Sequence, residues 1–134
     1  MNLHLAATPA AARRARSCVR HLLARHAVPA GTAEVLELLL TEVVTNAVRH
    51  GAVIDTFQVT VTTAPDGVTV RVTDDNPARP LVLDPPPEAL GGRGMQLVDR
   101  LADDWGVDTH ASGKTLWFRV GLDTGAGWAP ALAG

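Results

Sequence analysis

Apolar residues recur at helical spacing along the first part of the chain. Within residues 9–26 they form a stripe at Val19, Leu22 and Leu23, and Pro9 suits the first turn of a helix. Alanine, arginine and leucine are abundant in this segment and are strong helix formers. The pattern therefore predicts a helix over residues 9–26.

A second helical stripe follows a break at residues 28–32, where Thr32 is expected to be the N-cap. Gly51, at the other end, is a typical C-terminal signal. The pattern predicts a helix from about Thr32 to His50. Its apolar positions keep the spacing of one buried face: Leu36, Leu39, Leu40, Val43 and Ala47.

The apolar period then changes from 3.6 to 2. Apolar residues alternate with polar ones in FQVTVTT (57–63) and again in VTVRVTD (68–74). The linker APDG (64–67) has the composition of a turn. The sequence predicts an antiparallel hairpin with one apolar face, which suits a sheet covered by helices on a single side.

Residues 76–93 contain five prolines and no clear period, which predicts a loop of unusual length. Loops this long in compact domains tend to be functional. A helix is expected from about Gly94 to Asp104, and residues 115–122 (TLWFRVGL) resemble a closing strand.

The bulk composition is that of one ordinary globular domain, expected over residues 1–125, with residues 126–134 as a flexible tail. No apolar run approaches the ~20 residues of a membrane span. The N-terminus lacks the pattern of a secretory signal, and Cys18 is the only cysteine. We expect a cytoplasmic protein without membrane contact.

Charge is unevenly distributed. Residues 1–26 carry five arginines and no acid, whereas the rest of the chain carries 14 acids and seven bases. The net charge is therefore +5 in the first segment and −7 in the remainder. The basic segment could contact nucleic acid or an acidic partner, or form a solvated helix face that balances the acidic body. The low overall charge argues against a DNA-binding protein, so no direct nucleic-acid binding is expected.

Two polar residues interrupt the second predicted helix. Glu42 and Asn46 lie one turn apart and project from nearly the same side. A carboxylate and a carboxamide on one face could hold a hard cation through oxygen, with the acid free to accept a proton. The alternative is that both are solvent-exposed surface residues.

Three further features could contact a ligand. Asp74 ends the hairpin's second strand, where it could accept a hydrogen bond from an amino group or simply start a turn. Glycines 91, 92 and 94 lead into a helix, and such a junction can bind anions. The hydroxyl of Thr115 could reach a bound base, or the residue could simply suit a strand.

The order of these motifs resembles the ATP-binding family of gyrase, histidine kinases and MutL. Glu-x-x-x-Asn-Ala, a strand ending in V-x-D, a long loop ending in G-x-G before a helix, and G-K-T on a strand occur in sequence. Within that family, VTDDNP, GRGMQLVDRLADDWG and GKTLW are similar to the anti-sigma-factor serine kinases, particularly the short regulators abundant in actinobacteria. The resemblance spans about residues 9–122.

The resemblance implies an α+β fold, a two-layer α/β sandwich with helices on one face of a mixed, mostly antiparallel sheet. It also implies ATP and Mg²⁺ as cofactors. The implied function is a regulatory serine kinase and anti-sigma factor that holds a sigma factor inactive and phosphorylates an anti-anti-sigma partner of the STAS type. A homodimer is possible in such a system.

The resemblance also implies roles for individual residues. Asn46 matches the asparagine that coordinates magnesium, and Glu42 matches the catalytic base. Asp74 matches the aspartate that reads the adenine amino group, and Thr115 matches a threonine near the adenine. Gly92 and Gly94 match the glycines that let the lid backbone approach the phosphates.

One motif departs from the wider family, in which Asp-x-Gly-x-Gly replaces the run from Asp74 to Ala78. Pro77 stiffens what is elsewhere a hinge.

Two rival functions follow from the sequence. A sensor histidine kinase would need a helical dimerisation domain, for which the chain has no room. A non-catalytic regulator would bind nucleotide and a protein partner without transferring phosphate.

Overall fold

A single antiparallel sheet forms one layer of the computed structural model, which describes residues 1–51, 56–75 and 90–122. Its strands lie in the order β1-β2-β3-β5-β4, and every neighbouring pair is antiparallel. The strand bounds are β1 (Asn2–Ala6), β2 (Thr56–Ala64), β3 (Gly67–Asp74), β4 (Asp104–His110) and β5 (Gly113–Gly121).

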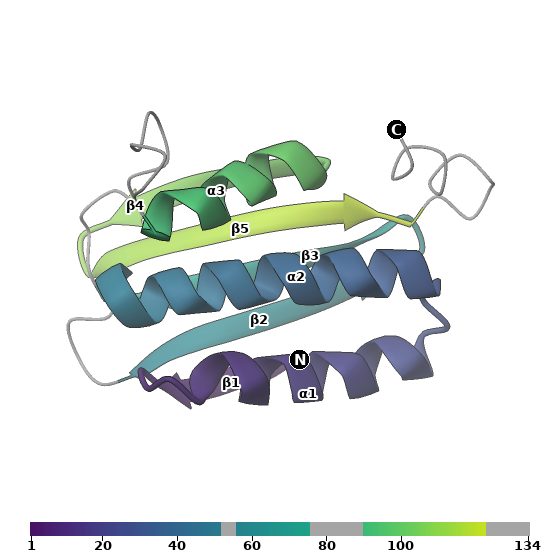
Figure 1. Cartoon of the computed structure of the whole chain (residues 1–134), viewed down its shortest axis with the longest axis horizontal. Helices are drawn as coiled ribbons and strands as arrows, with labels where there is room; N and C mark the ends of the chain where they lie inside the picture. Colours follow the sequence, from purple (N-terminus) through teal and green to yellow (C-terminus); the bar gives the residue numbers. More distant parts are fainter. Residues whose placement is uncertain (52–55, 76–89, 123–134) are drawn as a thin grey trace.

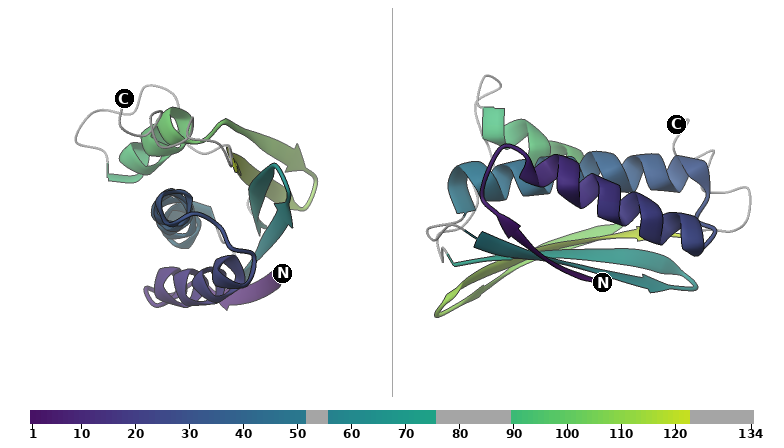
Figure 2. Two further views of the ribbon diagram at one scale, coloured as in Figure 1. Left: turned by 90° about the vertical axis from the view of Figure 1, so that its right-hand side faces the viewer. Right: turned by 90° about the horizontal axis from the view of Figure 1, so that it is seen from below.

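Helices form the second layer and cover one face of this sheet (Figures 1 and 2). Their bounds are α1 (Ala11–Arg25), α2 (Ala30–Asn46) and α3 (Leu90–Leu101), and a short π-helix, η1 (Ala47–Gly51), continues α2. The central helix, α2, packs between α1 and α3 and over β3 and β5. The α+β two-layer fold is therefore confirmed, with a sheet that is wholly antiparallel in the described residues.

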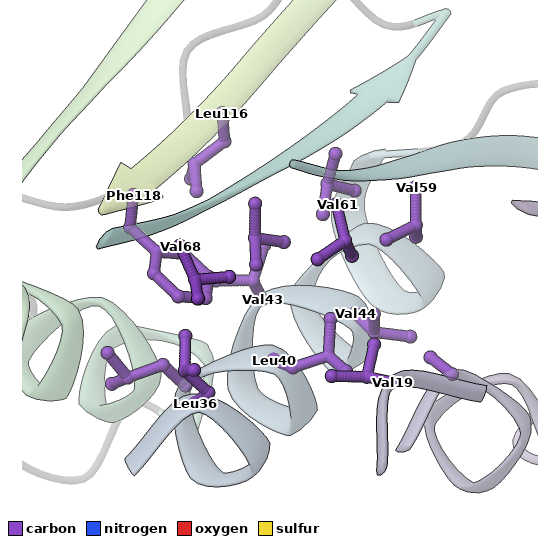
Figure 3. Close-up of a cluster of buried hydrophobic side chains, with 14 of the residues drawn as sticks. Val19, Leu36, Leu40, Val43, Val44, Val59, Val61, Val68, Leu116 and Phe118 are labelled. Carbon is purple, nitrogen blue, oxygen red and sulfur yellow. The ribbon is translucent and has the colours of Figure 1, made fainter. Parts of the chain in front are cut away.

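The core lies between α2 and the central strands. Alternate residues of β2 and β3 point toward the helices, as the period-2 pattern predicts, and the helical stripes meet them. Figure 3 shows Leu40 and Val43 of α2 among valines of the sheet and Phe118 of β5. Each buried side chain of this size contributes about 1.5–3 kcal/mol relative to exposure. The predicted apolar positions of both helices are all buried.

Polar contacts tie α1 to α2 above this core. Arg16 donates a hydrogen bond to the hydroxyl of Thr41 over 3.1 Å. Arg20 and Glu37 form an ion pair of 2.7 Å at the surface, and the hydrogen bond to Glu37 raises the pKa of the Arg20 guanidinium. Exposed pairs of this kind contribute little to stability, so burial of the apolar stripes is what holds the helices together.

Several boundaries differ from the sequence-based prediction. Helix α2 begins at Ala30 after the cap residue Pro29, so Thr32 is a buried residue of the first turn and not the N-cap. Helix α3 begins at Leu90, earlier than the predicted Gly94, and Asp104 starts β4 where the prediction continued the helix. The expected tail at 126–134 lies outside the described residues.

Candidate functional site

The candidate residues gather at one end of the sandwich. The C-terminal end of α2, the end of β3, the start of α3 and the turn between β4 and β5 all lie at this end, on the left in Figure 1. The π-helix η1 contacts β3 here, which brings the end of α2 close to the end of β3. Alternation along the strands and the length of α2 therefore determine which residues lie at this end.

Glu42 and Asn46 are both half-buried on the last turns of α2. Within residues 1–51, 56–75 and 90–122, neither side chain makes a hydrogen bond or an ion pair. The π-helix that follows Asn46 is a rare element, found frequently at functional sites. The pair thus presents an acid and an amide, one turn apart, at the end of the molecule where the strand termini lie.

Asp74 is the last residue of β3 and is only 8% exposed. Its side chain points to the helix-covered face, because it shares the alternation of the buried Val70 and Val72. A buried carboxylate needs a partner. One partner is Lys114, the residue directly across the ladder on β5, whose ammonium lies 3.1 and 3.2 Å from the two carboxylate oxygens.

Lys114 is itself only 4% exposed, so this ion pair is buried on both sides. Buried pairs are weak evidence for stability, because desolvation of two charges offsets most of their attraction, whereas removal of one partner is strongly destabilising. Sequence reasoning missed Lys114. The signal that identifies it is its position in the strand. It lies two and four residues before the core residues Leu116 and Phe118, so its side chain shares their face of the sheet.

Thr115 lies on the opposite face of the sheet from Asp74. Its hydroxyl is 2.9 Å from that of Thr73 and 3.4 Å from Nε2 of His110, both on the face without helices. The structure therefore brings Lys114, and not Thr115, to the carboxylate of Asp74.

Gly92 and Gly94 lie in the first turns of α3, whereas the sequence predicted glycines ahead of the helix. Glycine is unfavourable in a helix interior by roughly 1 kcal/mol relative to alanine, which is why the prediction ended the loop after them. The N–H of Gly92 is among the first four of the helix, which have no intrahelical acceptor. Gly94 lies one residue beyond that set.

A pocket opens at the same end of the sheet, and several of its lining residues lie on the face without helices. Strand register lines up three of these residues, His4, Gln58 and Thr73, across β1, β2 and β3. The pocket also reaches Asp74 of the ion pair, which is one of its lining residues. It is lined by His4, Thr56, Phe57, Gln58, Thr73, Asp74, Asp75, His110 and Ser112.

The comparisons with known proteins identify the family and the fold. A family model described as a histidine kinase-like ATPase domain matches residues 5–120. The chain belongs to the histidine kinase-like ATPase domain family. A search of curated proteins finds no match.

Solved structures share the fold of this ATPase-domain family. The RsbU and RsbW domains of a Mycobacterium tuberculosis protein align with a TM-score of 0.68 at 23% identity, over 90% of this chain and 32% of that one. The histidine kinase domain of a blue-light activated kinase from Erythrobacter litoralis aligns with a TM-score of 0.60 at 26% identity, over 92% and 64%. The chain thus spans less than two thirds of each of these relatives.

The oxygen atoms of Glu42 and Asn46 suit Mg²⁺ only if phosphate oxygens and water complete its coordination. No group of three or more His, Cys, Asp or Glu side chains in the described ranges is placed to hold a metal ion. Magnesium usually keeps several waters and binds through one or two protein oxygens together with phosphate oxygens. The Asn46 carboxamide oxygen, with Glu42 one turn away, fits that mode and not an all-protein cage.

None of the helices in the described part of the chain has the length and apolar character needed to cross a membrane.

Proposed function

We propose that the protein binds ATP with Mg²⁺ at the end of the sandwich where α2, β3 and α3 meet, and uses it as a regulatory serine kinase. The observation that carries the proposal is that two groups lie at the same end of a chain of this family. A half-buried Glu42–Asn46 pair ends α2, and a buried carboxylate, Asp74, ends β3 at the same end of the sheet.

Each group has a distinct role in this proposal. Asp74 accepts a hydrogen bond from the amino group of the base. The side-chain oxygen of Asn46 contacts Mg²⁺, which when bound neutralises charge on the phosphates. The start of α3 supplies the backbone N–H of Gly92 and the positive end of the helix dipole to the phosphates, and Gly92 and Gly94 let the backbone approach them closely.

Glu42 is the proposed general base. A carboxylate one turn before Asn46 lies close enough to the phosphate end to accept the proton of an attacking hydroxyl. Such a base typically contributes 10²–10⁴-fold to the rate. The acceptor would be a serine on an anti-anti-sigma protein of the STAS type, and the protein would also hold a sigma factor inactive. The structural likeness to an RsbW domain supports this choice of partners.

Transfer of labelled phosphate tests the proposal directly. The full chain is incubated with γ-labelled ATP, Mg²⁺ and a candidate anti-anti-sigma protein, with Glu42→Gln as the inactive control. Label on a serine of the partner supports the kinase. ATP binding by calorimetry without any transfer would instead identify a non-catalytic, nucleotide-dependent regulator. Absence of both heat and thermal shift with millimolar ATP would exclude a nucleotide-binding role.

A further inference from the structure

The carboxylate proposed to read the base already contacts a cation. Both oxygens of Asp74 lie within 3.2 Å of the Lys114 ammonium, and both side chains are 5% exposed. A base that approaches Asp74 therefore meets the lysine as well. The Asp74 carboxylate (acceptor) and the Lys114 ammonium (donor) lie side by side. Their separation is about that of two groups that hydrogen-bond to neighbouring atoms on one edge of a base.

The pair is held rigidly in place. Asp74 and Lys114 are directly opposed residues of the β3–β5 ladder, and the neighbouring rung is tied on the reverse face by the Thr73–Thr115 hydroxyl contact. Gly113 packs so closely on the backbone carbonyl of Asp74 that no Cβ would fit there. A recognition group that is fixed before the ligand arrives loses little entropy on binding.

The chemistry of the two groups matches one edge of a 6-aminopurine. A carboxylate offers about four lone-pair sites, so it can accept from a ligand amino group while it keeps the lysine. An ammonium has three donors that rotate about the side-chain end, so one of them can exchange a contact inside the protein for a ligand acceptor. Adenine presents such an acceptor, ring nitrogen N1, directly beside its amino group.

We propose that Asp74 and Lys114 read the base together: Asp74 accepts from the exocyclic amino group, and Lys114 donates to the adjacent ring nitrogen. Lys114 is thus the second specificity-determining residue of the site, and the ligand class is a 6-aminopurine nucleotide. This inference rests on the proposed nucleotide binding and adds a donor that an aspartate alone lacks. Hydrogen bonds from charged donors are about twice as strong as neutral ones.

The first test changes the ligand and leaves the protein intact. Calorimetry compares ATP with 1-deaza-ATP, in which ring nitrogen N1 is replaced by CH and the amino group is retained. Loss of a charged hydrogen bond should weaken binding of the analogue about 10- to 100-fold. Equal affinity of the parent protein for the two ligands would overturn the role of Lys114.

The second test removes the donor. Lys114→Met keeps the length of the side chain, and the matched control is Arg119→Met, on the same strand but on the opposite face. Lys114→Met should lose about 10- to 100-fold in ATP affinity and should bind ATP and 1-deaza-ATP within about twofold of each other. The control should keep the parent's affinity and its discrimination.

Other outcomes separate this inference from the function on which it rests. If Lys114→Met binds ATP as tightly as the parent or more tightly, the lysine is a bystander or a competitor of the base, and the inference is wrong while nucleotide binding stands. If the parent binds no ATP, the proposed function fails and the inference fails with it. If Lys114→Met does not fold, as judged by circular dichroism, the comparison of ligands on the parent decides alone.

Discussion

The ammonium of Lys114 lies 3.1 Å from one carboxylate oxygen of Asp74 and 3.2 Å from the other, at the last rung of the β3–β5 ladder. Both charged side chains are buried. The pair therefore couples the local stability of the sheet to the chemistry of the candidate site, and substitutions there should affect both.

Asp74→Asn should weaken ATP binding by at least about 10-fold, because the amide can turn a donor toward the donor amino group of the base. It also removes the negative charge from a buried ion pair, and loss of one member of such a pair costs about 3–5 kcal/mol. Calorimetry and chemical denaturation measure the two effects. The matched control is Asp66→Asn, whose partner Arg119 lies at the surface, where the loss should stay below about 1 kcal/mol.

Glu42→Gln should keep ATP binding within a few-fold while phosphotransfer falls by roughly 10²–10⁴-fold, because the amide cannot accept the proton. Binding is measured by calorimetry and transfer with labelled ATP. Glu34→Gln, at an exposed position on the same helix, should change neither. Equal losses of binding and transfer would make Glu42 a structural or metal-contacting residue.

Asn46→Ala should abolish the Mg²⁺-dependent part of ATP affinity and leave the fold intact, because the side chain is half-buried outside the apolar core. Adenosine, which lacks phosphates, should bind the variant and the parent equally. Titrations of both ligands with and without EDTA check this. If the variant binds Mg·ATP as well as the parent does, this face of α2 is ordinary surface.

Gly113→Ala should destabilise the fold by more than about 1 kcal/mol, because the new methyl group would collide with the backbone carbonyl of Asp74 at a backbone angle that favours glycine. Gly67→Ala is the matched control. A methyl group there meets only the flexible end of the Arg119 side chain, so the loss should be smaller. Thermal melts of the two variants give the comparison, and equal melting temperatures would contradict the packing argument.

Much of this fold could be predicted from periodicity. The central hairpin and the two long helices follow directly from apolar spacing, because their buried faces are long and regular. Strands β1 and β4 were not predicted. Both are edge strands with few buried residues, so apolar and polar residues alternate only weakly along them. Val107 and Trp105 do alternate with polar residues in β4, but Gly106 and the neighbouring acids obscure the pattern.

The candidate site was predicted less completely than the fold. The motif order indicated Asp74 and the Glu42–Asn46 pair, and the structure places all three at one end of the sheet. At the start of β5, however, the motif indicated Thr115, whereas Lys114 faces Asp74. Because side chains alternate along a strand, a shift of one residue moves a side chain to the other face. Only the pairing register resolves such a choice.

The Asp74–Lys114 rung also bears on how the chain folds. The two residues are 40 positions apart, whereas the β2–β3 and β4–β5 hairpins close over short turns. Loop-closure entropy delays non-local pairing relative to local hairpins, and burying two charges before the ladder is complete would be costly. The rung should therefore form late, after the folding transition state. Substitutions at either residue should then accelerate unfolding more than they slow folding.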